Sequence, residues 1–193
     1  MKRLFDLMSS LIAVVLLSPL LVIISVIIKL SDGGKVLFKQ KRGGRNQEHF
    51  YIYKFRTMIP NAEKIGLKYK TEENDPRITK VGSFLRKYSL DELPQLINII
   101  KGDMSIVGPR PALPVHTDNY NDYQLQRLEV KPGITGLAQI NGRNGLTWDE
   151  KIEWDLKYVR QASFWLDIKI IFKTVAVILR KDNIYQKEEE KDA

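Results

Sequence analysis

The sequence predicts a mostly helical α+β protein that attaches to one side of a membrane. Three observations lead to this prediction. An uncharged apolar stretch, residues 7–28, is long enough to form a membrane helix. Residues 36–58 combine β-branched and aromatic side chains around glycines, which is typical of a β-hairpin. Residues 147–160 and 164–180 carry apolar side chains at helical spacing, and the second segment is amphipathic and basic.

Composition narrows the classes of function. The chain of 193 residues has the length of one domain, and it has no cysteine, which excludes disulfides, thiolate catalysis and cysteine-bound metal. With only two histidines a zinc site is also disfavoured, whereas an oxygen-bound ion such as Mg²⁺ remains compatible. The net charge is +8, and the basic residues near the N-terminus flank the apolar stretch. This placement indicates a membrane surface, and no sequence motif supports nucleic-acid binding.

The apolar stretch contains Ser18 and Pro19 near its middle. Proline removes one helical hydrogen bond, and a neighbouring serine can satisfy the freed carbonyl. Basic residues lie at both ends of the stretch, so both ends favour the cytoplasmic side. The sequence therefore favours a re-entrant helix that kinks at Pro19, with a straight spanning helix as the alternative. A signal peptide fits poorly, because the stretch is long and no cleavage site follows it.

Basic and aromatic residues alternate at the end of the expected hairpin, over residues 53–58. The aromatic rings fit a core or a membrane surface. Lys54 and Arg56 are candidates for contacts with phosphate or lipid headgroups. Residues 81–88 then predict a short helix, capped by its own first residues, that carries Arg86 towards the next motif.

Asp91 and Glu92 are the adjacent carboxylates around which the candidate site is organised. Ser89-x-x-Glu92 has the spacing of a capping box, and the alternative is a helix with Pro94 as its first residue. In both cases the carboxylates lie beside free backbone N–H groups at the positive end of a helix dipole. Adjacent surface carboxylates are usually just solvated, but basic residues bracket this pair, as an anionic substrate requires. These residues are Arg86, Lys87, Lys101 and Arg110.

Two segments with glycine follow a helix predicted at residues 116–128: residues 131–136 and 141–144. As turns, they expose backbone N–H groups that, together with a cation, can hold phosphate oxygens, although each pattern is weak by itself. Three potential metal ligands lie at helical spacing in the predicted helix: His116, Asp118 and Asp122. A solvated helix face explains these three better than a metal site, because the required neighbouring ligands are missing.

The last third of the chain predicts two helices. A capping box, Thr147-x-x-Glu150, starts the helix of residues 147–160. Its expected buried stripe is Trp148, Ile152, Leu156 and Val159. The helix of residues 164–180 has apolar and basic faces, which fits core packing but, beside an anchored N-terminus, favours the membrane interface. Residues 61–75 and 187–193 predict irregular or disordered structure.

The motifs, taken in order, resemble one known family. The run SLDELPQLINIIKGDMSIVGPRP, residues 89–111, resembles the core signature of bacterial sugar transferases. It is most similar to the small monotopic phosphoglycosyl transferases, which use a polyprenol phosphate. The resemblance also takes in residues 54–58, 131–136 and 139–144, so it extends from the first helix to about Leu179.

The resemblance implies a membrane topology. A re-entrant helix is expected over residues 1–30, with its break at Ser18 and Pro19. A catalytic domain over residues 31–180 is expected on the cytoplasmic face of the bacterial inner membrane. Residues 181–193 are expected to form a charged, disordered tail.

The resemblance also implies a reaction, the transfer of a phospho-sugar from a UDP-sugar to undecaprenyl phosphate with release of UMP. Asp91 is the expected nucleophile, which forms an aspartyl-phosphosugar intermediate. Mg²⁺ is the expected cofactor, with Asp91 and Glu92 as ligands, and Glu92 has an orienting or general-base role as alternatives. The residues expected to bind substrate are Lys54, Arg56, Arg86, Arg110 and Arg143. The product would start capsule, exopolysaccharide, O-antigen or glycoprotein synthesis, so downstream glycosyltransferases are candidate partners.

Two other classes of function remain open. A non-enzymatic membrane scaffold would share the anchor and the basic surface, but it gives no reason for Asp91 and Glu92 among arginines and glycines. An enzyme that transfers groups from CDP-alcohols would need several spanning helices and a multi-aspartate motif, and the sequence has neither. The sequence does not identify the donor sugar.

Overall fold

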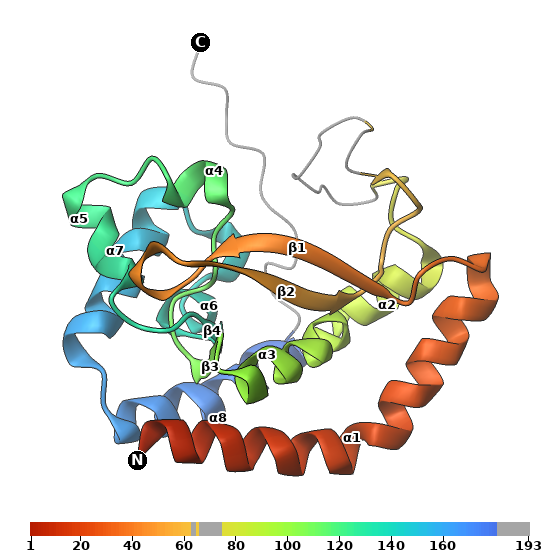
Figure 1. Cartoon of the computed structure of the whole chain (residues 1–193), viewed down its shortest axis with the longest axis horizontal. Helices are drawn as coiled ribbons and strands as arrows, with labels where there is room; N and C mark the ends of the chain where they lie inside the picture. Colours follow the sequence, from red (N-terminus) through yellow and green to blue (C-terminus); the bar gives the residue numbers. More distant parts are fainter. Residues whose placement is uncertain (63–64, 66–74, 181–193) are drawn as a thin grey trace.

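The structure, a computed structural model, describes residues 1–62, 65 and 75–180. Most of the loop predicted at residues 61–75, and the predicted tail, lie outside the described residues. The described part is mostly helical with two small sheets, as Figure 1 shows. The α-helices are α1 (Lys2–Asp32), α2 (Lys80–Lys87), α3 (Leu96–Lys101), α4 (Pro114–Thr117), α5 (Asp122–Leu125), α6 (Leu137–Ile140), α7 (Trp148–Gln161) and α8 (Phe164–Arg180). The strands are β1 (Leu37–Gly43), β2 (His49–Phe55), β3 (Ser105–Val107) and β4 (Gly133–Thr135). Short 3₁₀ helices are η1 (Arg45–Gln47), η3 (Leu90–Gln95), η4 (Gln126–Leu128) and η5 (Arg143–Gly145).

Helix α1 bends near its middle, so its two halves border two sides of the molecule (Figure 1). Pro19 lies inside the helix and has no N–H to donate to the carbonyl of Val15, four residues earlier. The hydroxyl of Ser18 donates to that same carbonyl at 2.8 Å. The bend and its local compensation therefore match the prediction made for Ser18 and Pro19.

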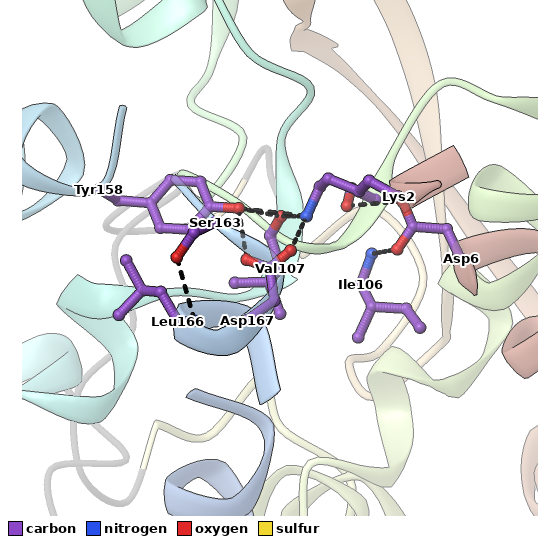
Figure 2. Close-up of polar contacts among 9 residues, drawn as sticks. Lys2, Asp6, Ile106, Val107, Tyr158, Ser163, Leu166 and Asp167 are labelled. Carbon is purple, nitrogen blue, oxygen red and sulfur yellow. Dashed lines mark hydrogen bonds and ion pairs between the residues drawn. The ribbon is translucent and has the colours of Figure 1, made fainter. Parts of the chain in front are cut away.

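Polar contacts hold the first turns of α1 against the rest of the chain (Figure 2). The ammonium of Lys2 donates to the Asp167 carboxylate and, at 3.1 Å, to the Tyr158 hydroxyl. The carboxylate of Asp6 accepts from the backbone N–H of Ile106 at 3.1 Å. Asp6 and Asp167 are both buried, and these hydrogen bonds offset the cost of burying their polar groups.

Apolar contacts hold the second half of α1 instead. Ile24 and Ile28 are buried against Phe55 of β2 and Leu85 of α2. Both ends of α1 therefore contact the same body of the protein. Between these contacts the helix exposes large apolar side chains: Leu11, Ile12, Val15, Leu16, Val22, Ile23, Val26 and Ile27. By length and composition, α1 is able to cross a membrane.

Strands β1 and β2 form the predicted antiparallel hairpin, in a register that runs from Leu37 opposite Phe55 to Gly43 opposite His49. Strands β3 and β4 form a second, parallel pair, where residues 131–136 were wrongly predicted to be a turn. Their backbones approach so closely that a Cβ on Gly133 would lie 2.1 Å from the nitrogen of Gly108. Glycine is therefore required at this crossing.

Two helix predictions are corrected by capping side chains. The helix predicted at residues 116–128 is wrong, because the chain divides into α4, α5 and η4. Asn121 starts α5 with a capping box, and a cap residue needs a non-helical backbone, which interrupts the helix. Helix α2 is capped by Thr79, whose hydroxyl accepts from the N–H of Gly82 at 2.9 Å, and not by residues within its own start. His116, Asp118 and Asp122, for which the sequence favoured a solvated helix face over a metal site, do not share one helix. His116 lies in α4, Asp122 lies in α5, and Asp118 between them pairs with His49.

Helices α7 and α8 cover the parallel strand pair. The predicted capping box at Thr147 is present. The buried side chains of α7 are Ile152, Asp155, Leu156 and Tyr158, whereas Trp148 and Val159 are half-buried. Helix α8 divides its apolar side chains between two faces, because Ile170 is buried beside Val107 and Tyr158. Its exposed apolar residues are Phe164, Trp165, Phe172, Val175 and Leu179.

Candidate active site

The 3₁₀ helix η3 presents the two carboxylates and continues directly into α3. Ser89, just before it, has a φ of 56° and makes no side-chain cap, so the predicted capping box with Glu92 is wrong. The alternative is also corrected, because Pro94 lies inside η3 and α3 begins at Leu96. The Ser89 hydroxyl instead accepts from the Arg143 guanidinium at 2.9 Å. A serine with positive φ is strained, and such residues cluster at active sites.

Asp91 is a buried carboxylate that keeps its hydrogen-bonding capacity. It is 8% exposed, and none of the described residues donates a hydrogen bond to its carboxylate. Burial is the main cause that raises its pKa to about 6, while the positive charges of Lys54, Arg86 and Arg110 oppose this rise and the negative charge of Glu92 adds to it. Near neutral pH, Asp91 is therefore mostly ionised, with lone pairs available to a ligand.

Glu92, in contrast, uses both carboxylate oxygens. Its Oε1 accepts from Nζ of Lys54 at 2.8 Å and from Nη2 of Arg110 at 2.5 Å, and its Oε2 accepts from Nη1 of Arg110 at 3.3 Å. Burial favours a higher pKa for Glu92, but Arg110 and Lys54 outweigh it and hold the pKa well below its usual value. Glu92 is thus ionised and fixed in orientation, and it brings Lys54 and Arg110 together.

Arg86 reaches the site from the last turn of α2. Its Nε donates to the Thr57 hydroxyl at 2.9 Å, and its charge acts on Asp91. Gly82 makes this approach possible, because a Cβ there would lie 2.0 Å from the carbonyl oxygen of Thr57. A larger residue at position 82 would push α2, and Arg86 with it, away from the site.

Two arginines that no sequence motif indicated, Arg42 and Arg127, hold the backbone around Arg110. Arg127 donates to the carbonyl of Arg110 itself at 2.7 Å, and Arg42 donates to the carbonyl of Pro111 at 3.1 Å. Burial and the nearby charge of Arg110 lower the pKa of Arg42 to about 10. Because both arginines lie far from Asp91 in the sequence, no local pattern could have identified them.

The other two predicted substrate contacts lie in different places. Arg143 contacts Ser89, and Ser89 precedes Asp91 by two residues. Arg56 lies at the base of the hairpin, where its guanidinium fills the space over Gly34. The roles of these two residues towards a substrate remain predictions.

The residues fit a metal ion in one arrangement. Among the described residues, no group of three or more histidine, cysteine, aspartate or glutamate side chains is placed to hold an ion. Mg²⁺, however, is commonly bound by one or two carboxylates together with substrate phosphates. The Asp91 carboxylate has the capacity for such a contact, whereas Glu92 is already paired with two cations. The site therefore fits Mg²⁺ that a substrate phosphate helps to hold.

Comparison with known proteins places the chain among sugar transferases. The family model described as "Bacterial sugar transferase" matches residues 1–181. The chain is 44% identical to "Uncharacterized sugar transferase EpsL" of Bacillus subtilis (strain 168), over 96% of this chain and 91% of that protein.

Two similar proteins are named for a reaction. The UDP-glucose:undecaprenyl-phosphate glucose-1-phosphate transferase of Escherichia coli (strain K12) is 45% identical over 91% of this chain and 39% of its own length. The undecaprenyl-phosphate galactose phosphotransferase of Salmonella typhimurium (strain LT2) is 40% identical over 96% of this chain and 42% of its own length. This chain thus spans less than half of either enzyme. By the family model and by these identities, it belongs to the bacterial sugar transferase family.

Proposed function

We propose that this protein transfers a phospho-sugar from a UDP-sugar to undecaprenyl phosphate, which yields undecaprenyl diphosphate-sugar and UMP. The observation that carries the proposal is the Asp91 carboxylate, buried beside Lys54, Arg86 and Arg110 with no hydrogen bond from any described residue. Relatives named for undecaprenyl phosphate support the choice of acceptor. One of these names also supports a UDP-sugar donor.

The reaction would proceed in two displacements at one phosphorus atom. In the first, an oxygen of Asp91 attacks the phosphorus that carries the sugar, the bond to the bridging oxygen breaks, and UMP leaves with the electron pair. In the second, an oxygen of undecaprenyl phosphate attacks the same phosphorus and releases the Asp91 carboxylate. The acceptor phosphate is already largely ionised near neutral pH, so the second step needs no strong base.

The cations around Asp91 would neutralise phosphate charge in both steps, which is the main requirement of phosphoryl transfer. Arg86, whose charge acts on Asp91, and Arg143, which donates to Ser89, are candidates for this role, and Arg56 is a further candidate at the base of the hairpin. The ion pairs of Glu92 favour an orienting role for this residue over a metal-ligand or general-base role. Glu92 would hold Lys54 and Arg110 in the positions where they meet the donor diphosphate.

We include Mg²⁺ in the proposal. Asp91 would hold the ion together with phosphate oxygens of the donor, and Glu92 remains a second candidate ligand. When bound, the ion would supply charge neutralisation at the diphosphate. The residues of the chain would position the donor and exclude water around Asp91.

We also propose that α1 enters one membrane leaflet and returns to the same face. Its bend at Pro19, its exposed apolar residues, and the contacts of both its ends with one body support this topology. A straight helix would carry its ends to opposite faces. Residues 1–30 would then be the membrane element and residues 31–180 the catalytic domain, on the cytoplasmic face of the bacterial inner membrane. The exposed apolar face of α8 would rest at the interface.

The proposal is tested by UMP release in detergent-solubilised protein. UDP-glucose and UDP-galactose are the first donors to try, with and without undecaprenyl phosphate and Mg²⁺. We expect metal-dependent UMP release from one donor, its loss in Asp91→Asn, and its retention in the matched control Asp149→Asn, an exposed carboxylate on α7. Folded protein that releases no UMP from a panel of UDP-sugars would favour the scaffold alternative.

UMP release in this assay would also point to a pathway that uses the lipid-linked product. The product would enter assembly of a capsule, an exopolysaccharide, an O-antigen or a glycoprotein. Glycosyltransferases that extend the lipid-linked sugar are then the expected partners.

A further inference from the structure

An aromatic pair, formed by the exposed Phe84 of α2 and the half-buried Tyr88 that ends this helix, precedes the candidate nucleophile. The ring of Phe84 is 57% exposed and lies 4.9 Å from the ring of Tyr88. Asp91 follows Tyr88 after only two further residues. A single exposed apolar side chain is ordinary, so the position of this pair in the fold decides whether it has a function.

Different sides of α2 contact different parts of the protein. Gly82 and Arg86 face Thr57 and the charged site. Val81 and Leu85 pack against the second half of α1.

At about 100° per residue, Phe84 and Tyr88 fall on the stripe beside Val81 and Leu85, on the side away from Thr57. The aromatic pair therefore borders the contact between α2 and α1. The same half of α1 exposes apolar side chains: Val22, Ile23, Val26 and Ile27. Apolar side chains of both helices therefore lie near the contact between α1 and α2, which precedes Asp91 in the chain.

We propose that Phe84 and Tyr88 form a binding site for the prenyl chain of the lipid acceptor. This inference rests on the proposed function, and it adds the place where the chain lies while the acceptor phosphate reaches Asp91. Helix α2 would separate the two parts of the acceptor, with Arg86 directed to the phosphate side and Phe84 to the hydrocarbon side. A prenyl chain fits better than an arbitrary membrane lipid, because Tyr88 precedes the reacting carboxylate of Asp91 by only three residues in the chain.

The two-step reaction allows the acceptor site to be tested separately from the donor site. The test compares Phe84→Ala with wild type in detergent micelles that contain increasing mole fractions of undecaprenyl phosphate. We expect the KM for undecaprenyl phosphate to rise roughly tenfold. This is the change expected on removal of one ring that the bound prenyl chain would cover. The stoichiometric burst of UMP without acceptor should be unchanged, because the donor does not contact this face. Phe84→Leu should recover most of the affinity.

Phe172→Ala on α8 is the matched control, since Phe172 is also an exposed ring (73%) but lies on another helix. An unchanged KM in Phe84→Ala, a lost UMP burst in that variant, or an equal rise of KM in Phe172→Ala would each overturn the inference. The last result would indicate general membrane attachment. Failure of the proposed function looks different, because wild type itself would then release no UMP.

Discussion

Asp91 and Asp155 are both buried carboxylates near arginines, but they differ in what their oxygens contact. Asp155 on α7 is fully buried (0% exposed) and accepts from Nε of Arg127 at 2.6 Å. Arg127 is 4% exposed, and its other nitrogens donate to the Tyr120 hydroxyl and to the carbonyl of Arg110. Asp91 has cations within electrostatic reach but accepts no hydrogen bond from the described residues.

The difference shows that burial beside an arginine does not by itself identify a catalytic carboxylate. Oδ1 of Asp155 has no partner among the described residues, but it is sealed from solvent, so no substrate can reach it. The Asp91 carboxylate accepts no hydrogen bond from the described residues, and Asp91 keeps 8% of its surface exposed to solvent. We therefore assign Asp155 to the support of the fold and of Arg110, and Asp91 to the proposed chemistry.

The largest expected effect is on enzymatic activity, which should fall much more on substitution of Asp91 than on substitution of Asp155. Asp91→Asn should lower UMP release at least about a thousandfold, because the attacking oxygen is lost. Asp155→Asn should lower the activity of the folded fraction less than about tenfold, because Arg110 is only loosened. UMP release, normalised to folded protein by circular dichroism, measures both. Similar losses in the two variants would remove the distinction.

The next effect separates the two aspartates by stability. Asp155→Asn should lower the free energy of unfolding by about 3 kcal/mol, because Arg127 is left buried without a counter-charge. Denaturant unfolding in detergent, followed by fluorescence, measures the change. The double variant Asp155→Leu with Arg127→Met is the control, and it should recover much of the loss because no unpaired charge remains.

For Asp91 the effect on stability should have the opposite sign. Asp91→Asn should raise the free energy of unfolding by about 3 kcal/mol at pH 7.5, because burial disfavours the ionised carboxylate. The folded-state pKa of Asp91, about 6, lies above its usual value of 3.8, so wild-type stability falls as pH rises through this interval. The gain from asparagine should therefore be absent below about pH 4 and complete above about pH 6. A gain that is equal at pH 4 and pH 7.5 would contradict this origin.

The smallest expected effect concerns the influence of Glu92 on Asp91. The negative charge of Glu92 contributes to the raised pKa of Asp91. Glu92→Gln should therefore move the acid limb of activity to lower pH, by about one unit. Single-turnover UMP release measured against pH, at one saturating Mg²⁺ concentration for both proteins, gives the shift. A limb that stays in place or moves to higher pH would show that Glu92 does not act on Asp91 through its charge.

Features whose signals lie within one or two helical turns could be predicted from the amino-acid sequence alone. The apolar stretch with Ser18 and Pro19 was sufficient for a bent helix, because the freed carbonyl and the hydroxyl that satisfies it are three residues apart. The alternating residues around glycine predicted the hairpin, and Thr147-x-x-Glu150 predicted the start of α7. The sequence also indicated that cations surround Asp91, because Arg86 and Arg110 lie close to it in the chain.

The pairing of cations with carboxylates, in contrast, depends on contacts between residues that are far apart in the chain. Lys54 and Arg110 lie 38 and 18 residues from Glu92, and no sequence period indicates that both would pair with Glu92 and leave Asp91 unoccupied. Tertiary contacts also overruled local preferences, because Ser89 hydrogen bonds to Arg143 in place of the capping box. The physical reason is that local propensities are worth only tenths of a kcal/mol per residue, whereas buried charges and polar groups cost much more when they lack partners.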